Sequence, residues 1–188
     1  MAVSASGQSS ELLIEVVGVL NARGIDYVVI GAMAVSLHGV VRASVDADAI
    51  VSATSGQMKA LSKELAASGL TTEFRMGEEF DAIPAMLIVS DRHENRVDLL
   101  MGLRQLDSEV YSRAKEIIVP ELGAPLRFAS REDLIAMKLF AGSPKDLMDV
   151  ERMIAVGGSL VDFDLVQRLA ARFGRNAVEN YKKIVERS

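Results

Sequence analysis

The sequence predicts an α/β (α+β) fold in which a small mixed sheet is flanked by helices and followed by a helical C-terminal part. Short β-branched runs alternate with helical periodicities up to residue 129. From Ser130 onward, apolar residues recur at helical spacing. A length of 188 residues suits one such unit. We therefore expect a flexible tail over residues 1–8, a core over 9–129 and a helical region over 130–188 that packs on the core.

Within the core, each expected element is bounded by glycine, proline or small polar residues. Ser9 or Ser10 can cap a first helix that ends near Gly24. Two further helices are expected over 32–39 and 55–69. Strands are expected over 26–31, 42–51, 71–76, 85–91 and 96–102, with an edge hairpin over 117–130 that has prolines near its turn.

The helical region divides into four predicted helices. Capping residues begin three of them, namely Ser130, Ser143 and Asp162, and the last begins at about Asn176. The final stretch, "VQRLAARFGRNAVENYKKIVERS", carries six Lys or Arg residues and two Glu. Such a basic helical stretch usually forms a solvated face, with RNA contact as the alternative.

The composition excludes several kinds of site. No cysteine is present, which removes disulfides, thiolate metal sites and thiol nucleophiles, and two histidines argue against the usual zinc site. The formal charge of −5 gives no support to a general nucleic-acid-coating role. The start, "MAVSASGQSS", lacks the features of a signal peptide, and no apolar run approaches the roughly 20 residues that span a bilayer. We expect a cytoplasmic protein without membrane contact.

The stretch "RASVDADAIV" places Asp46 and Asp48 in a predicted strand. Alternate residues of a strand share a face, so the two carboxylates point the same way and repel each other unless a cation lies between them. Asp98 occupies a similar strand, "RVDLLMG". If the two strands are neighbours, three carboxylates converge and offer the oxygen ligands that Mg²⁺ prefers. The alternative is that the aspartates are solvated or paired with Arg42 or Arg96.

The residues around these aspartates resemble a known family. "YVVIGAMAVSLHGVVRASVDADAIV" is similar to the start of the DNA polymerase β-like nucleotidyltransferases, where an apolar strand ending in Gly-Gly or Gly-Ser precedes a helix and a D-x-D strand. It looks closest to the small AbiEii-like bacterial nucleotidyltransferases, with their hG-x-x-R-x-T-x-D-x-D run. The residues that match are Gly31, His38, Gly39, Arg42, Ser44, Asp46 and Asp48. Downstream, "DLIAMKLFAGSPKDLMDVERM" resembles the lysine-containing helix of that group.

The resemblance implies a nucleotidyltransferase fold and transfer of a nucleoside monophosphate from an NTP to a hydroxyl, with release of pyrophosphate. The implied cofactor is Mg²⁺ or Mn²⁺, and the acceptor is a tRNA, a protein or a small molecule. Some relatives are toxins of toxin–antitoxin pairs, which adds an antitoxin-like protein as a possible partner. The resemblance implies that Asp46, Asp48 and Asp98 are both metal ligands and catalytic carboxylates, and that Lys138 is also catalytic. The implied nucleotide-binding residues are Gly31, Ala32, Arg42, Lys138, Asp146 and Asp149.

Two departures from the family pattern keep an alternative open. Ala32 stands where the second Gly or Ser is usual, and Ser143 stands where Arg is frequent. The alternative is an inactive module of the same fold that binds a nucleotide or a partner.

Several implied residues also have structural interpretations. Gly31 can simply end a strand. Asp146 fits a capped helix start with Ser143 and Pro144, and Asp149 can pair with Lys138 or with another nearby cation. The ammonium of Lys138 either reaches a phosphate or stays at the edge of the core.

Overall fold

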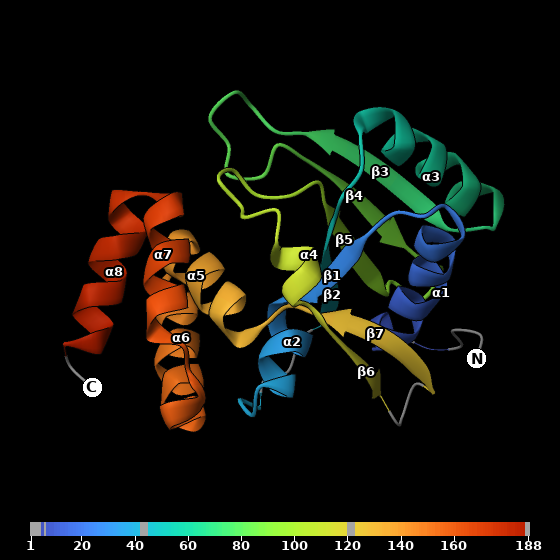
Figure 1. Ribbon diagram of the computed structural model, residues 1–188. Coiled ribbons are helices and arrows are strands. Elements are labelled where there is room, and N and C mark those ends of the chain that lie inside the picture. The colour runs from blue at the N-terminus through green and yellow to red at the C-terminus, as the bar shows by residue number, and fades with distance from the viewer. Residues whose placement is uncertain (1–4, 6, 42–44, 120–122, 187–188) are drawn as a thin grey trace.

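A seven-stranded mixed sheet forms the centre of the N-terminal part of the protein (Figure 1). The computed structural model describes residues 5, 7–41, 45–119 and 123–186. The strands are β1 (Tyr27–Ile30), β2 (Asp46–Val51), β3 (Thr71–Met76), β4 (Ala85–Ser90), β5 (Arg96–Leu100), β6 (Lys115–Val119) and β7 (Ala124–Phe128). They lie in the order β3-β4-β5-β2-β1-β7-β6. The β2–β5 and β1–β7 pairs are parallel and the remaining pairs are antiparallel, which confirms the predicted mixed sheet.

The helices fall into two groups along the chain. The first group is α1 (Ser9–Ala22), α2 (Gly31–Leu37), α3 (Ser55–Ala67) and the short α4 (Val110–Arg113). The second is α5 (Arg131–Ala141), α6 (Pro144–Gly157), a 3₁₀ turn (Gly158–Leu160), α7 (Phe163–Phe173) and α8 (Arg175–Val185). The α/β fold class is confirmed, and α4 is an element that the sequence pattern did not predict.

Strand alternation in β2 separates a buried face from a polar one. Ala47 and Ala49 are buried, whereas Asp46 and Asp48 on the opposite face are partly exposed. Helices α1 and α3 lie together on one side of the sheet, and the second helical group lies apart from them (Figure 1). The small alanine side chains allow α1 to pack closely on β2 and β5. The charged face of β2 is thereby left outside the apolar core.

The start of α1 differs from the prediction. Gln8 is the N-cap and makes no side-chain cap, so the expectation that Ser9 or Ser10 caps this helix is wrong. The buried Ser9 hydroxyl instead donates to the Val45 carbonyl at 2.5 Å and accepts the Arg96 backbone N–H at 3.0 Å. Buried polar groups need partners, and here the carbonyl just before β2 and the N–H at the start of β5 provide them. Ser9 therefore joins the two strands that carry the aspartates.

The predicted helices after residue 130 are present, and the last begins at Arg175, one residue earlier than expected. Helix α5 packs against α6, α7 and α8, and the rings of Phe140 and Phe173 stack with their centroids 4.7 Å apart. Gly142 ends α5 in the left-handed conformation, with φ of 66°. Within the described residues, no helix has the length and the apolar run required to cross a bilayer.

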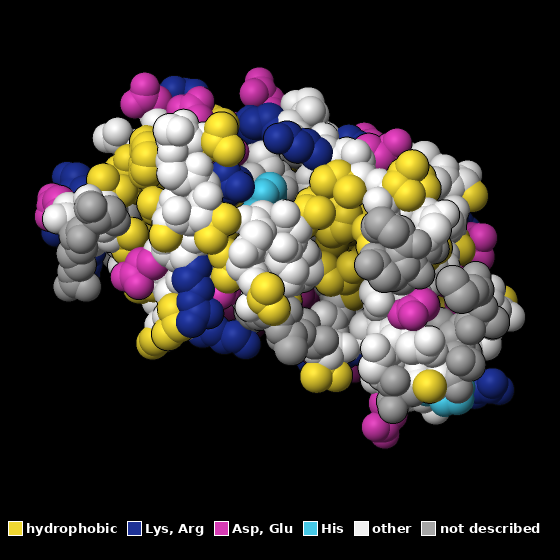
Figure 2. Space-filling view, turned by 90° about the horizontal axis from the view of Figure 1, so that it is seen from below, with side chains coloured by type: hydrophobic (Ala, Val, Ile, Leu, Met, Phe, Trp, Pro, Cys, Tyr) yellow, Lys and Arg dark blue, Asp and Glu magenta, His cyan; other side chains and the backbone are white. Residues whose placement is uncertain are grey.

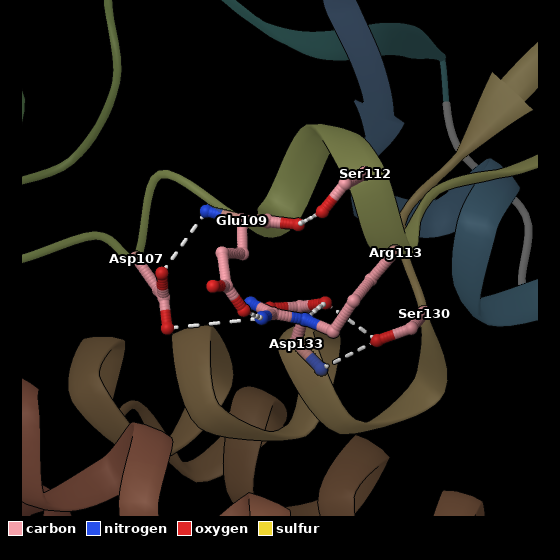
Figure 3. A network of polar contacts seen from close by, with 6 residues as sticks. All are labelled: Asp107, Glu109, Ser112, Arg113, Ser130 and Asp133. Carbon is pink, nitrogen blue, oxygen red and sulfur yellow. Dashed lines mark hydrogen bonds and ion pairs between the residues drawn. The ribbon is translucent and has the colours of Figure 1, made fainter.

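A buried ion pair lies where the chain leaves the sheet for the second helical group (Figure 3). Arg113, at the end of α4, donates to both carboxylate oxygens of Asp133 in α5, at 2.9 and 2.6 Å. The Ser130 hydroxyl donates to the same carboxylate at 2.6 Å and accepts the Asp133 N–H as the N-cap of α5. Asp107 and Glu109 approach Arg113 from the other side. These contacts fix the start of α5 relative to α4.

Candidate functional site

Two aspartates lie opposite each other on neighbouring central strands. Strands β2 and β5 run parallel, with Asp48 paired with Asp98 and Asp46 paired with Arg96. Paired residues of adjacent strands point to the same face, about 4.8 Å apart in the backbone. The prediction that the strand of Asp98 lies beside that of Asp46 is confirmed. All three carboxylates therefore share the face of the sheet that the apolar core leaves uncovered.

Arg96 is the cation that pairs directly with Asp98 on this face. Its Nε and Nη2 atoms donate to the two oxygens of Asp98, at 2.7 and 2.8 Å. The side chain of Asp98 is 13% exposed and that of Arg96 is 38% exposed. The hydrogen bond to Asp98 raises the pKa of Arg96, and the charges of Asp46 and Asp48 act in the same direction. The structure thus supplies the counter-charge that two like-charged strand residues require.

Gly31 approaches Asp48 more closely than any other residue type would permit. It begins α2 directly after β1, and its φ is +66°. A Cβ atom at this position would lie 2.1 Å from Oδ2 of Asp48. Ala32 follows as a buried residue of α2. Arg42, the remaining predicted nucleotide contact in this part of the chain, lies outside the described residues.

The three aspartates are of the chemical type that binds a hard divalent cation, but their side chains do not surround a single point. Carboxylate oxygens are the ligands that Mg²⁺ and Mn²⁺ take, and Asp46, Asp48 and Asp98 offer them from one face. In the described part of the chain, no three Asp, Glu, His or Cys side chains converge closely enough to surround an ion. In this arrangement the guanidinium of Arg96 engages both oxygens of the third carboxylate, Asp98.

The other predicted site residues form a second group, in the helical region. The Lys138 ammonium is buried and lies 2.9 Å from an oxygen of Asp146 and 2.8 Å from one of Asp149. Ser143 caps α6 by accepting the Asp146 N–H. The structure therefore brings Lys138, Asp146 and Asp149 together as an ion triad between α5 and α6. This arrangement matches the structural interpretation of these residues.

A hollow of about 350 Å³ lies on the same sheet as the aspartates, at the loop between β3 and β4. Its lining is mostly apolar, and the residues are Arg75, Met76, Gly77, Asp81, Ala82, Ile83, Ala85 and Met86. Met86 pairs with Leu100, two residues beyond Asp98 on β5. The loop is fixed by Arg104, which follows β5 and donates to the carbonyls of Glu79 and Asp81. The hollow is thus held at a defined place relative to β5.

Two residues of this region were not predicted as site members. Arg96 was considered only as an ion-pair partner, although its position two residues before Asp98 puts both on one face. That spacing was the available signal. Arg104 gave no signal, because its role depends on a loop that lies more than twenty residues away in the sequence.

Charge is mixed on the face of the molecule that Figure 2 shows. On the face shown in Figure 2, the described Lys and Arg side chains are interspersed with acidic and hydrophobic ones. A nucleic-acid-coating surface would instead gather basic side chains into a stripe or patch.

Taken together, the mixed sheet, the glycine that begins α2 and the aspartates on adjacent strands define a protein of the nucleotidyltransferase class. The chain belongs to the family described as "Nucleotidyltransferase of unknown function (DUF6036)", which matches residues 12–186. The predicted superfamily is thereby confirmed, while the special likeness to AbiEii-like proteins stays a prediction. Transfer of a nucleoside monophosphate is the reaction of this class of enzyme.

Solved structures with the same fold include two proteins that were determined with an antibiotic or an adenylylated antibiotic bound. One is ANT(2″)-Ia in complex with adenylyl-2″-tobramycin, with a TM-score of 0.55 and 18% identity over 88% of this chain and 96% of that one. Another is the lincosamide antibiotic adenylyltransferase LnuA, lincomycin-bound, with a TM-score of 0.51 and 12% identity over 82% and 99% of the two chains.

A third structure with this fold is an antigenic nucleotidyltransferase-like protein from Paracoccidioides brasiliensis. Its TM-score is 0.50, with 17% identity over 97% of this chain and 93% of that one. At these identities the likenesses show the fold. No curated protein sequence matches this chain.

Proposed function

We propose that the protein transfers a nucleoside monophosphate from an NTP to a hydroxyl group, with Asp46, Asp48 and Asp98 as the ligands of Mg²⁺ or Mn²⁺. One observation carries the proposal: Asp48 and Asp98 are paired on adjacent parallel strands, with Asp46 on the same face. The family of the chain makes nucleotidyl transfer the reaction that these carboxylates serve. A bound divalent cation would neutralise phosphate charge and orient the phosphate oxygens.

The proposed reaction is an in-line displacement at the α-phosphorus. The acceptor hydroxyl oxygen forms a bond to this phosphorus, the bond to the β-phosphate oxygen breaks, and pyrophosphate leaves. The hydroxyl proton passes to a carboxylate of the site, and Asp98 is the proposed base. Gly31 leaves room beside Asp48, and the backbone at the start of α2 is placed to approach the phosphates. Positioning and charge neutralisation provide most of the catalysis in such a site.

A small-molecule acceptor is the first to test. ANT(2″)-Ia and LnuA, which share the fold over most of this chain, are described with antibiotics bound. The mostly apolar hollow at the loop between β3 and β4 offers a place for a small acceptor on the same sheet as the proposed base, because its lining residue Met86 pairs with Leu100, two residues beyond Asp98. A tRNA or a protein acceptor remains the alternative. An antitoxin-like partner and a cytoplasmic location stay predictions.

Lys138 remains part of the proposal, but mainly in a structural role. The resemblance assigns it to the triphosphate, but its ammonium already has two carboxylate partners. An ammonium shared by two carboxylates carries no surplus positive charge to offer a phosphate. We therefore propose that Lys138, Asp146 and Asp149 chiefly fix α5 against α6, and that any phosphate contact requires one carboxylate to move away.

The test compares wild type with Asp48→Asn. With α-labelled NTP, Mg²⁺ and separate pools of small molecules, RNA and proteins, the wild type is expected to label one pool and release pyrophosphate. Asp48→Asn keeps the size of the side chain but removes its charge, and should lower the transfer rate by at least ~10²-fold, about 2.7 kcal/mol of transition-state stabilisation. Metal-dependent NTP binding is measured in parallel.

Glu73→Gln is the matched control, because Glu73 lies on the same face of the sheet but two strands away from Asp98. Its transfer rate should equal that of wild type. Equal rates in wild type and Asp48→Asn would exclude Asp48 as a metal ligand. A wild type that binds Mg–NTP without labelling any pool would support the inactive binding module instead.

A further inference from the structure

Arg96 competes for the same carboxylate that the proposed metal ion needs. Both of its donating nitrogens face Asp98, and both oxygens of Asp98 are engaged. On the neighbouring strand, Arg96 lies opposite Asp46, while Asp98 lies opposite Asp48. Among the described residues, the guanidinium thus pairs with Asp98 and also lies within reach of the charges of Asp46 and Asp48. The bidentate guanidinium occupies the inner lone pairs of both oxygens, which a chelating divalent cation would also need.

The contact between Arg96 and Asp98 has a well-defined geometry. Bidentate arginine–carboxylate pairs are among the stronger charge-assisted hydrogen bonds, and the low exposure of Asp98 limits its screening by water. The backbone N–H of Arg96 is also bound to Ser9, which fixes the start of β5 and so the point from which the side chain extends. The guanidinium itself is partly exposed, so its side chain can turn away from the sheet without breaking the core.

We propose that Arg96 is an exchangeable counter-ion of the site: it holds Asp98 in the metal-free protein, releases it when the metal–NTP complex binds, and then pairs with the triphosphate. This inference rests on the proposed function. A free metal ion has to displace the guanidinium from Asp98 without compensation. The metal–NTP complex brings phosphate oxygens, which are alternative bidentate partners for a guanidinium. Arg96 thus makes the site favour the metal–nucleotide complex over the bare ion.

The experiment measures binding in the absence of turnover. Mn²⁺ alone is titrated into wild type and Arg96→Gln, and free Mn²⁺ is followed by electron paramagnetic resonance. Because its competitor is gone, Arg96→Gln should bind Mn²⁺ about three- to tenfold more tightly. At saturating Mn²⁺, the same variant should bind α,β-methylene-ATP more weakly, by about threefold or more. These changes have opposite signs, whereas damage to the fold would weaken both.

Arg75→Gln is the matched control. Arg75 makes a bidentate pair with Glu73, two residues away on β3, and this pair lies on the exposed edge of the same sheet. The variant removes the same charge without removing a hydrogen bond to Asp98, and its remaining electrostatic effect on Asp98 is screened by solvent. It should therefore leave Mn²⁺ affinity within about twofold of wild type.

The outcomes separate this inference from the proposed function. Equal or weaker Mn²⁺ binding by Arg96→Gln would overturn the counter-ion role, and unchanged binding of the ATP analogue would overturn the transfer of Arg96 to the triphosphate. Asp48→Asn serves as the reference for the site itself. If Asp48→Asn bound Mn²⁺ as well as wild type, the metal site of the proposed function would fail, and the inference with it.

Discussion

Gly31 and Asp48 belong to different elements, yet they approach so closely that no side chain fits between them. Gly31 begins α2, and Asp48 lies in β2, opposite the last residue of β1. The close approach and the positive φ both require glycine at this position. The site therefore requires glycine at position 31, because there is no room for a side chain there.

Gly31→Ala is expected to disturb both the fold and the site. The positive φ alone should cost about 1 kcal/mol, and displacement of the Asp48 carboxylate should add to this. Gly24→Ala isolates the first effect, because Gly24 has nearly the same φ, +63° against +66°, and open space around it. Urea unfolding measures both variants.

The double variant Gly31→Ala with Asp48→Ala removes the two closest atoms, Oδ2 and Cγ of Asp48, and leaves only a Cβ contact of 3.1 Å, so it should recover most of the stability that Gly31→Ala loses beyond Gly24→Ala. If Gly31→Ala alone were no less stable than Gly24→Ala, the contact with Asp48 would be without energetic consequence.

At the scale of elements, the link between α4 and α5 determines how the helical region joins the sheet. Arg113 reaches from the end of α4 over the first turn of α5, where Ser130 and Asp133 face it (Figure 3). The Asp133 side chain is 2% exposed and carries a charge that Arg113 balances. Burial of an ion pair is costly, but removal of one partner costs more because the other charge stays buried.

Arg113→Ala is expected to lower the free energy of unfolding by about 3–5 kcal/mol, because it leaves Asp133 buried with only Ser130 and its backbone as partners. The comparison is Arg175→Ala, in which the lost partner is Glu179 in an exposed i,i+4 pair, worth about 0.3–0.5 kcal/mol. Chemical denaturation gives both values. Similar losses for the two variants would show that the pair between α4 and α5 contributes no more than a surface ion pair.

At the scale of the whole molecule, His38 connects α2 to the point where the chain leaves the sheet. Its Nε2 lies 3.0 Å from the Ala129 carbonyl, and since a carbonyl only accepts, Nε2 carries the proton. Burial lowers the pKa of His38 below its ordinary value of 6.5, the hydrogen bond to Ala129 opposes this, and the positive charge of Arg131 adds to the lowering. The fold therefore favours the neutral ring.

This pKa shift predicts how stability changes with pH. With the folded pKa below the unfolded one, the unfolded chain binds more protons in the range between them, so stability increases with pH there. The contribution of His38 to the free energy of unfolding is fully present above about pH 6.5, and it is lost as the pH falls from there through the pKa of the folded state. His38→Gln should reduce the loss seen between about pH 7.5 and pH 5.5 in urea unfolding. The control His93→Gln retains His38 and should lose as much stability over this pH range as wild type. If His38→Gln also lost as much stability as wild type, the pH dependence could not be assigned to His38.

The elements and the shared face of the aspartates could be predicted because they depend on neighbours in the chain. Side-chain alternation in β2 and the helical spacing after Ser130 are local properties, and the motif around Asp46 and Asp48 lies within one short stretch. Length and periodicity were likewise enough to predict the mixed sheet and the helical region after it.

Only the tertiary structure decided which groups meet. Strands β2 and β5 pair although β3 and β4 lie between them in the sequence, and this pairing sets Asp98 beside Asp48. It also places Arg96 opposite Asp46. Ser9 bridges the starts of the two strands, where the local pattern predicted a helix cap. Several cations were equally plausible partners for each carboxylate, and the choice depends on backbone packing between distant segments. The partner of a buried charge such as Asp133 is Arg113, twenty residues away in the sequence, so this pair depends on the tertiary structure and is not encoded in the neighbouring residues.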